Sequence, residues 1–246
     1  MSVFPLAPER YLVSIAADSA LLADAAALGA GRALPSCPGW DTDTLLGHLG
    51  LLHRRVAAMV AAPRPTRVAT DDLPPPPAPG KRDHWFRDGA ASLVAALTVA
   101  GTARACWTLD DPEGESAFWF RRMAQETLMH RVDAELAVGP PSEIEGALAA
   151  DGVDEALLVH LPRRLRRGAI EGLAAEALVE ASDEGSAWRL SLTADAVRPG
   201  NGEAGETLAG PAAALLCYLW NRGDAAALTF GGAARVFPNW SALVQM

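Results

Sequence analysis

The chain has 246 residues, half of them apolar, and a formal net charge of −9. This length allows one large domain or two small ones, and it can bury a core without disulfide or metal staples. The acidic balance and the lack of a long basic stripe argue against nucleic-acid binding, because neutralising phosphates needs clustered Lys and Arg.

The spacing of the cysteines and the distribution of apolar residues predict a cytoplasmic protein that does not span a membrane. Cys37, Cys106 and Cys217 are scattered without CxxC spacing, a pattern typical of reduced thiols inside the cell. The first ten residues lack a basic region followed by an apolar core, and no run of about 18 uninterrupted apolar residues occurs. The bias to Ala, Arg, Gly and Pro indicates a GC-rich genome. The sequence does not separate a monomer from a small homo-oligomer.

Four helical patterns occupy the first 141 residues. The first covers residues 8–28, where Pro8 suits the first helical turn. The second begins after Asp41, which stands at an N-cap position, and runs to about residue 62. Residues 64–80, with four consecutive prolines, predict an extended surface loop. Two further helices are expected at 83–103 and 116–138, and four helices of this length fit an antiparallel bundle.

The pattern changes after residue 141. Residues 144–161 predict a helix, residues 187–192 and 227–230 predict strands, and residues 207–220 predict a short apolar helix between the strands. The expected fold class is α+β. A four-helix bundle over residues 1–141 is followed by a smaller α+β domain over residues 142–246, which is an ordinary domain size.

The helix expected at 116–138 carries ionisable residues on its inward face. Counting by threes and fours places one stripe on Trp119, Met123, Glu126, His130, Asp133 and Ala137. The stripe begins apolar, so it should face the bundle interior, where an unpaired carboxylate is costly. Glu126 and His130 are four residues apart and point to one spot above the helix. This spacing allows both to bind one metal ion.

The helix after Asp41 offers a third ligand. Its expected apolar stripe consists of Leu45, His48, Leu52, Val56 and Met59. His48 is therefore predicted to point inward, toward the Glu126 and His130 pair. Two His and one Glu leave a fourth position for water or substrate, as in catalytic zinc sites.

The spacing alone leaves other interpretations open. An inward histidine is commonly a hydrogen-bonded core residue, and Glu126 can instead form an ion pair with Arg122 or His130. Asp133 can orient a ligand, contact a substrate or pair with Arg131.

Three short blocks resemble the mycothiol-dependent maleylpyruvate isomerase family. Residues 35–40 read PSCPGW and are followed by LLGHL at 45–49, which resembles the family's CPGW…HL signature. Residues 118–127, FWFRRMAQET, and 130–135, HRVDAE, resemble its second signature. Residues 208–216, LAGPAAALL, with LWNR at 219–222, are similar to the GPA…LWxR stretch of its smaller domain.

The resemblance implies a DinB-like bundle in which His48, Glu126 and His130 hold a divalent metal, with Zn²⁺ preferred over Ni²⁺ or Mn²⁺. Asp133 matches the family's acidic catalytic residue. Arg222 matches a site arginine that would bind a substrate carboxylate. Members use mycothiol, a low-molecular-weight thiol of actinobacteria, either as the cofactor of an isomerase or as the nucleophile of S-transfer. The implied partners are this thiol and a small electrophilic substrate.

Two other functions stay open at the sequence level. One is a metal-dependent hydrolase that activates water, and the other is a non-catalytic protein that binds a small molecule at the metal.

Among the remaining residues, His53 is predicted at the surface, off the His48 face. Trp40 is expected to pack at the start of the second helix. Cys37 and Cys106 have no activating histidine beside them in the sequence.

Overall fold

The computed structural model describes residues 6–109, 111–233 and 235–244. Its contacts divide the chain into two compact units, with the division between Ser142 and Glu143. We call Leu6–Ser142 the bundle unit and the described residues from Glu143 onward the sheet unit.

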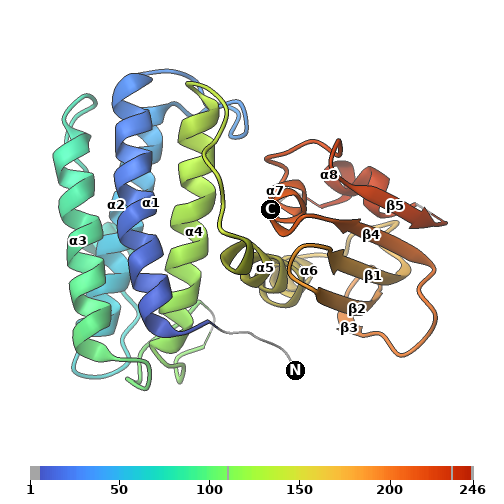
Figure 1. Ribbon diagram of the computed structural model, residues 1–246. Helices are drawn as coiled ribbons and strands as arrows, with labels where there is room; N and C mark the ends of the chain where they lie inside the picture. The colour runs from blue at the N-terminus through green and yellow to red at the C-terminus, as the bar shows by residue number, and fades with distance from the viewer. Residues whose placement is uncertain (1–5, 110, 234, 245–246) are drawn as a thin grey trace. The chain divides into compact units, whose positions relative to one another are not determined.

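The bundle unit contains four long helices among its described residues (Figure 1). These are α1 (Pro8–Leu28), α2 (Thr42–Ala61), α3 (Arg82–Ala100) and α4 (Ala117–Leu136). A short 3-10 turn, η1 (Thr70–Asp72), interrupts the proline-rich loop. Helices α1 and α2 each pack against both α3 and α4. The predicted four-helix bundle is confirmed.

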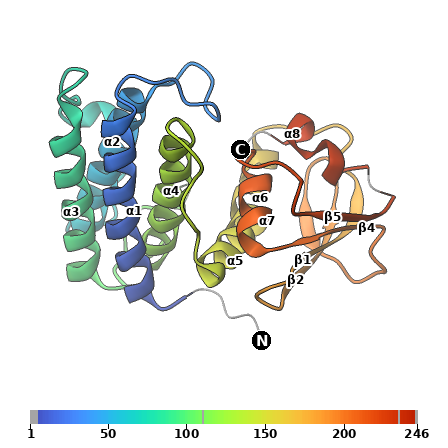
Figure 2. The same cartoon turned by 45° about the horizontal axis from the view of Figure 1, so that its top comes forward.

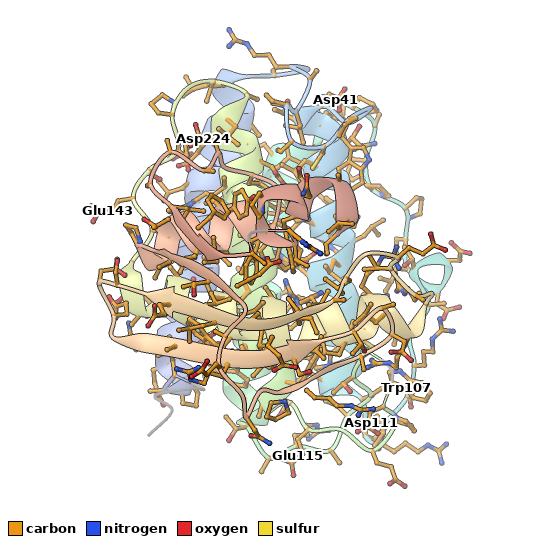
Figure 3. All side chains as sticks on the ribbon, turned by 90° about the vertical axis from the view of Figure 1, so that its right-hand side faces the viewer. Asp41, Trp107, Asp111, Glu115, Glu143 and Asp224 are labelled. Atoms are coloured by element: carbon orange, nitrogen blue, oxygen red, sulfur yellow. The ribbon has the colours of Figure 1, made fainter. Side chains whose placement is uncertain are left out.

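The helix ends follow from local chemistry. Pro8 occupies the first turn of α1, where its missing N–H leaves no hydrogen bond unmade. Asp41, labelled in Figure 3, caps α2 because its Oδ1 accepts a hydrogen bond from the Thr44 N–H at 2.7 Å. Helix α3 ends at Gly101, whose φ of 64° is a backbone conformation that glycine adopts without strain.

Close packing between α2 and α3 depends on Gly50. A Cβ at this position would lie 2.3 Å from the Trp85 ring of α3, so only glycine leaves room for the indole. The guanidinium of Arg54 lies over the same ring, 4.0 Å from its centroid. This packing fixes the part of α2 that carries His48.

Helix α1 is long and apolar enough to cross a membrane by length and composition, the only helix among the described residues to meet that test. The buried core helix of a globular bundle meets the same test. Its most buried side chains, among them Ile15 and Leu22, face the other helices of the bundle unit.

The sheet unit begins with a helical stretch of three pieces. These are α5 (Gly146–Glu155), a π-helical turn η2 (Ala156–His160) and α6 (Leu161–Arg166). Figure 2 shows α5, α6 and α7 (Ala212–Leu219) on one side of the sheet. The 3-10 turn η3 (Phe237–Asn239) and the short helix α8 (Trp240–Leu243) follow the last strand.

In the described part of the sheet unit, five strands form one sheet in the order β3-β2-β1-β4-β5. The bounds are β1 (Ala175–Ala181), β2 (Ser186–Leu192), β3 (Val197–Pro199), β4 (Glu206–Gly210) and β5 (Thr229–Gly232). Only β1 and β4 run parallel, and the other pairs are antiparallel. Alternate residues of β1, β2 and β4 are buried, as a sheet with one covered face requires.

Two sequence expectations for this unit were incomplete. The helix predicted over 207–220 is wrong at its start, because Glu206–Gly210 forms β4 and the helix begins only at Ala212. Pro211 separates the two elements, and the residue before a proline is disfavoured in a helix. The strands β1 and β3 were not predicted. The α+β fold class is confirmed.

Candidate metal centre

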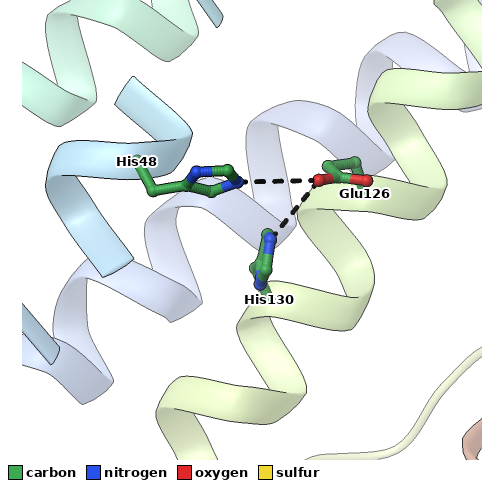
Figure 4. Close-up of side chains that lie close together, drawn as sticks. All are labelled: His48, Glu126 and His130. Atoms are coloured by element: carbon green, nitrogen blue, oxygen red, sulfur yellow. Dashed lines mark ion pairs between the residues drawn. The ribbon is translucent and has the colours of Figure 1, made fainter. Parts of the chain in front are cut away.

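Three side chains from two helices of the bundle unit converge on one point. His48 comes from α2, and Glu126 and His130 come from successive turns of α4 (Figure 4). Glu126 Oε1 lies 3.9 Å from His48 Nε2 and 3.4 Å from His130 Nε2. One nitrogen or oxygen atom from each residue lies within 4.8 Å of the other two. The three predicted ligands are therefore brought together.

These distances suit a divalent metal. Zinc lies about 2.0–2.2 Å from histidine nitrogen and carboxylate oxygen, so adjacent ligand atoms of a tetrahedral site are about 3.3–3.5 Å apart. The Glu126–His130 distance already has this value, and the His48–Glu126 distance exceeds it by roughly half an ångström. His48 is 41% exposed, so its side chain has room for that adjustment. Within the described residues, no fourth His, Cys, Asp or Glu joins the group.

Arg122 holds the other oxygen of the Glu126 carboxylate. Its Nη2 donates to Glu126 Oε2 at 2.8 Å, and the arginine side chain is almost fully buried. Both interactions considered for Glu126, an ion pair with Arg122 and a contact with His130, are present together. Because Glu126 Oε2 accepts this hydrogen bond from Arg122, Oε1 is the oxygen that faces the two histidines.

Asp133 supports His130 from the opposite side. Its carboxylate is fully buried, and Oδ2 lies 2.9 Å from His130 Nδ1. An ionised carboxylate only accepts hydrogen bonds, so Nδ1–H donates, and in the neutral ring the lone pair is on Nε2. Metal-binding histidines commonly have such a carboxylate partner. Arg131, the other partner considered for Asp133, forms an ion pair with Asp18 at 3.2 Å.

The electrostatics of the cluster follow from burial and close opposite charges. Burial by itself would lower the pKa of His130, but hydrogen bonds to Asp133 and Glu126 and their charges raise it to about 9. Burial opposes ionisation of Glu126, yet Arg122, His130 and His48 together hold its pKa well below the usual value. A metal ion at this position would take the place of the proton on His130.

The loop that precedes α2 contributes residues for which the sequence analysis foresaw no role in the site. The Trp40 ring lies 4.8 Å from the His48 ring and 6.3 Å from the His130 ring, between centroids. Ser36 and Cys37 both donate to Asp133. No histidine adjoins Cys37 in the sequence, so its contact with the site depends on the fold. The available signal was the position of PSCPGW immediately before the helix that carries His48.

The prediction that His53 lies at the surface is wrong. His53 is fully buried, its Nε2 lies 3.0 Å from Thr127 Oγ1, and its ring stacks on Phe86. The buried face of α2 runs through Leu45, Leu49, His53, Val56 and Val60. Leu45, Val56 and Met59 of the expected stripe are buried, but Leu52 is only partly buried and His48 is exposed, so His48 reaches the cluster from the edge of the buried face. Burial lowers the pKa of His53 to about 3, so the ring is neutral.

Arg222 belongs to the sheet unit, just after α7. Its backbone N–H donates to Cys217 O at 2.7 Å, and its Nη1 donates to Trp220 O at 2.7 Å. The preceding residue, Asn221, has a φ of 60° and anchors the turn through a hydrogen bond from Nδ2 to Val244 O. The role of Arg222 in a site stays a prediction.

Comparisons with known proteins agree with the geometry. Residues 14–135 match the model of the mycothiol maleylpyruvate isomerase N-terminal domain. A crystal structure of the mycothiol-dependent maleylpyruvate isomerase aligns with a TM-score of 0.66 at 15% identity, covering 94% of this chain and 95% of that chain. A histidine-to-alanine mutant of the isomerase aligns with the same TM-score and coverage at 13% identity. Comparison with functionally curated proteins gives no match. The matched domain contains every residue of the His48, Glu126 and His130 cluster, and the bundle unit belongs to the mycothiol maleylpyruvate isomerase N-terminal domain family.

Proposed function

We propose that this chain is a metal-dependent isomerase that uses mycothiol to act on a small unsaturated acid. The observation that carries the proposal is the cluster of His48, Glu126 and His130, supported by Asp133 and lying inside the matched family domain. The coordinating set is two imidazoles and one carboxylate, which is a donor set of catalytic zinc sites. Zn²⁺ is the preferred ion, and Ni²⁺ or Mn²⁺ is the alternative.

The residues present fit such an ion. When bound, the metal would favour the ionised form of a thiol at its remaining position, and that thiolate is the nucleophile which adds reversibly to an electrophilic double bond. Reversible addition permits rotation about the former double bond, so it interconverts cis and trans isomers. If the thiol adduct were kept instead, the same site would serve S-transfer.

The chain's own residues preorganise this site. Arg122 fixes the rotamer of Glu126, and Asp133 fixes the ring orientation and tautomer of His130. The Trp40 ring lies beside both histidine rings. Asp133 has both carboxylate oxygens engaged within the protein, so we assign it to holding His130. Arg222 is proposed to bind a substrate carboxylate through its guanidinium.

Metal content is the first test. Protein purified without a histidine tag is expected to contain about one equivalent of zinc or a similar ion by elemental analysis. His48→Ala and His130→Ala should each lose the metal, with circular dichroism spectra that match the parent. His84→Ala is the control, because His84 is an exposed residue of α3 that pairs with Asp88. Full retention of metal in the His48 and His130 variants would overturn the ligand assignment.

Thiol dependence is the second test. Isomerisation of maleylpyruvate by the zinc-loaded protein should require added mycothiol, and the thiol should not be consumed. Consumption of thiol in proportion to product would indicate S-transfer. Turnover of ester or amide substrates without any thiol would indicate a hydrolase, and stoichiometric binding without turnover would indicate a binding protein.

A further inference from the structure

The loop between α1 and α2 is a compact hydrogen-bonded turn. The Leu34 N–H donates to Trp40 O at 2.9 Å, and the Trp40 N–H donates to Cys37 O at 3.0 Å. Gly39 has a φ of 85°, which favours glycine at this point of the turn. The turn leads directly into the Asp41 cap of α2. We call residues 34–40 the PGW turn.

Two side chains of the PGW turn donate to the same buried carboxylate. The Ser36 hydroxyl donates to Asp133 Oδ1, and Cys37 Sγ lies 3.5 Å from Asp133 Oδ2. Oδ2 also accepts from His130 Nδ1 at 2.9 Å. Asp133 is therefore held by the turn on one side and holds His130 on the other. The contacts run in an unbroken series from the turn to the imidazole.

This arrangement has a consequence for His130. A fully buried carboxylate with a free oxygen would rotate to find another donor, and unpaired burial is costly. The Ser36 hydroxyl fixes Oδ1, which leaves Oδ2 aligned with Nδ1 of the imidazole. The ring is then held with Nε2 directed at Glu126, 3.4 Å away. An alternative role for Ser36 and Cys37 in filling space alone does not explain why both donors converge on one acid.

We propose that Ser36 and Cys37 are positioning residues that preset His130 for metal binding by holding Asp133. The inference rests on the proposed metal site. Neither side chain is assigned a contact with metal or substrate. Ser36 should matter more, because a hydroxyl donates to a carboxylate more strongly than a thiol does.

The test measures zinc affinity by competition with a chromophoric chelator. Loss of a residue that orients a ligand typically weakens metal binding by about 10- to 100-fold. Ser36→Ala should weaken it by about 10-fold, at the low end of that range because Ser36 acts through Asp133. Cys37→Val should weaken it by a smaller factor, and Cys37→Ser, which restores a donor, should return it to the parent value. Cys217→Val, at a cysteine of the sheet unit, is the matched control and should leave the affinity unchanged.

A second measurement separates this inference from the metal site itself. In metal-free protein, the hydrogen-bonded Nδ1–H of His130 should give a slowly exchanging downfield proton signal, assigned by its loss in His130→Gln. Ser36→Ala should broaden that signal, and Cys37→Ser should preserve it. If the parent shows this behaviour but binds no zinc, the proposed function fails and the positioning role stands. If Ser36→Ala and Cys37→Val leave both the signal and the zinc affinity unchanged, the positioning role is wrong.

Discussion

His130 lies between two carboxylates, with Asp133 2.9 Å from Nδ1 and Glu126 3.4 Å from Nε2. Burial lowers the pKa of the imidazole, but hydrogen bonds to these carboxylates and their charges raise it to about 9. A metal ion binds only the neutral ring, so at neutral pH it must displace a bound proton. The Glu126 carboxylate, which completes the proposed ligand set, therefore also stabilises the proton on His130 that competes with the metal.

Zinc affinity should rise with pH. Between pH 7 and 9, each unit should strengthen binding by about tenfold, and the rise should level off above the pKa of His130. Chelator competition at fixed ionic strength measures the slope, and calorimetry in buffers of different ionisation enthalpy counts the released proton. Asp133→Asn should lower the pKa of His130 and flatten the slope.

The stability of the metal-free protein should show the opposite trend. A histidine whose folded-state pKa is raised from 6.5 to about 9 adds stability that is fully present below about 6.5. That stability is lost as the pH rises through about 9. Affinity and stability that are both unchanged between pH 7 and 9 would contradict the charge assignment of His130.

At the scale of elements, α2 and α4 are joined in the core by a polar pair. His53 Nε2 and Thr127 Oγ1 lie 3.0 Å apart, both residues are fully buried, and His53 Nδ1 has no hydrogen-bond partner among the residues that the structure describes. Since the ring is neutral, its one hydrogen bond offsets only part of the cost of burying it. On α2 His53 lies five residues after His48, and on α4 Thr127 lies one residue after Glu126.

Removing only Thr127 from this pair should lower the free energy of unfolding more than removing both members. Thr127→Val keeps the side-chain shape but leaves both His53 nitrogens unsatisfied, which should lower the free energy of unfolding by about 1–3 kcal/mol. Adding His53→Leu removes the unsatisfied group and should recover part of that loss. Urea unfolding measures all three free energies. A double variant less stable than Thr127→Val would show that the imidazole contributes packing that leucine does not replace.

The bundle helices were predictable because their signals are local. Pro8 and the Asp41 cap mark helix starts, and the Glu126, His130 and Asp133 spacing lies within one helix. The stripe predicted for α2 was correct at Leu45, Val56 and Met59 but missed His53, because the buried face includes Gly50, which has no apolar side chain to reveal it. Gly50 is buried because Trp85 packs against it, and that contact is tertiary.

The sheet unit was less predictable for a related reason. The sequence of β1, AEALVEA, consists mainly of good helix formers, and only pairing with β2 and β4 makes it a strand. The family resemblance, rather than spacing, assembled the metal ligands from two helices. The contacts of Ser36 and Cys37 with Asp133 span nearly a hundred residues of sequence, so no local pattern could place them.

At the scale of the whole molecule, we propose a division of labour between domains 1–141 and 142–246. The proposed metal ligands all belong to the first, and Arg222 belongs to the second. A match that ends at residue 135 covers the first domain only, whereas the structural likeness extends over 94% of the chain. Metal binding and substrate recognition should therefore respond to different substitutions.

Arg222→Gln tests that division. It removes the cation proposed to bind a substrate carboxylate, so KM should rise by about 10- to 100-fold, as expected for losing a charge-assisted hydrogen bond of roughly 1.5–3 kcal/mol. Zinc content should stay at one equivalent, because no proposed ligand lies in the sheet unit.

Arg198→Gln makes the same charge change at an exposed position of β3 and should leave KM unaltered. The melting temperature must stay near that of the parent, since Arg222 Nη1 also donates to Trp220 O. An equal KM increase in both variants would reflect net charge alone, and zinc loss in Arg222→Gln would mean that the second domain supports the metal rather than the substrate.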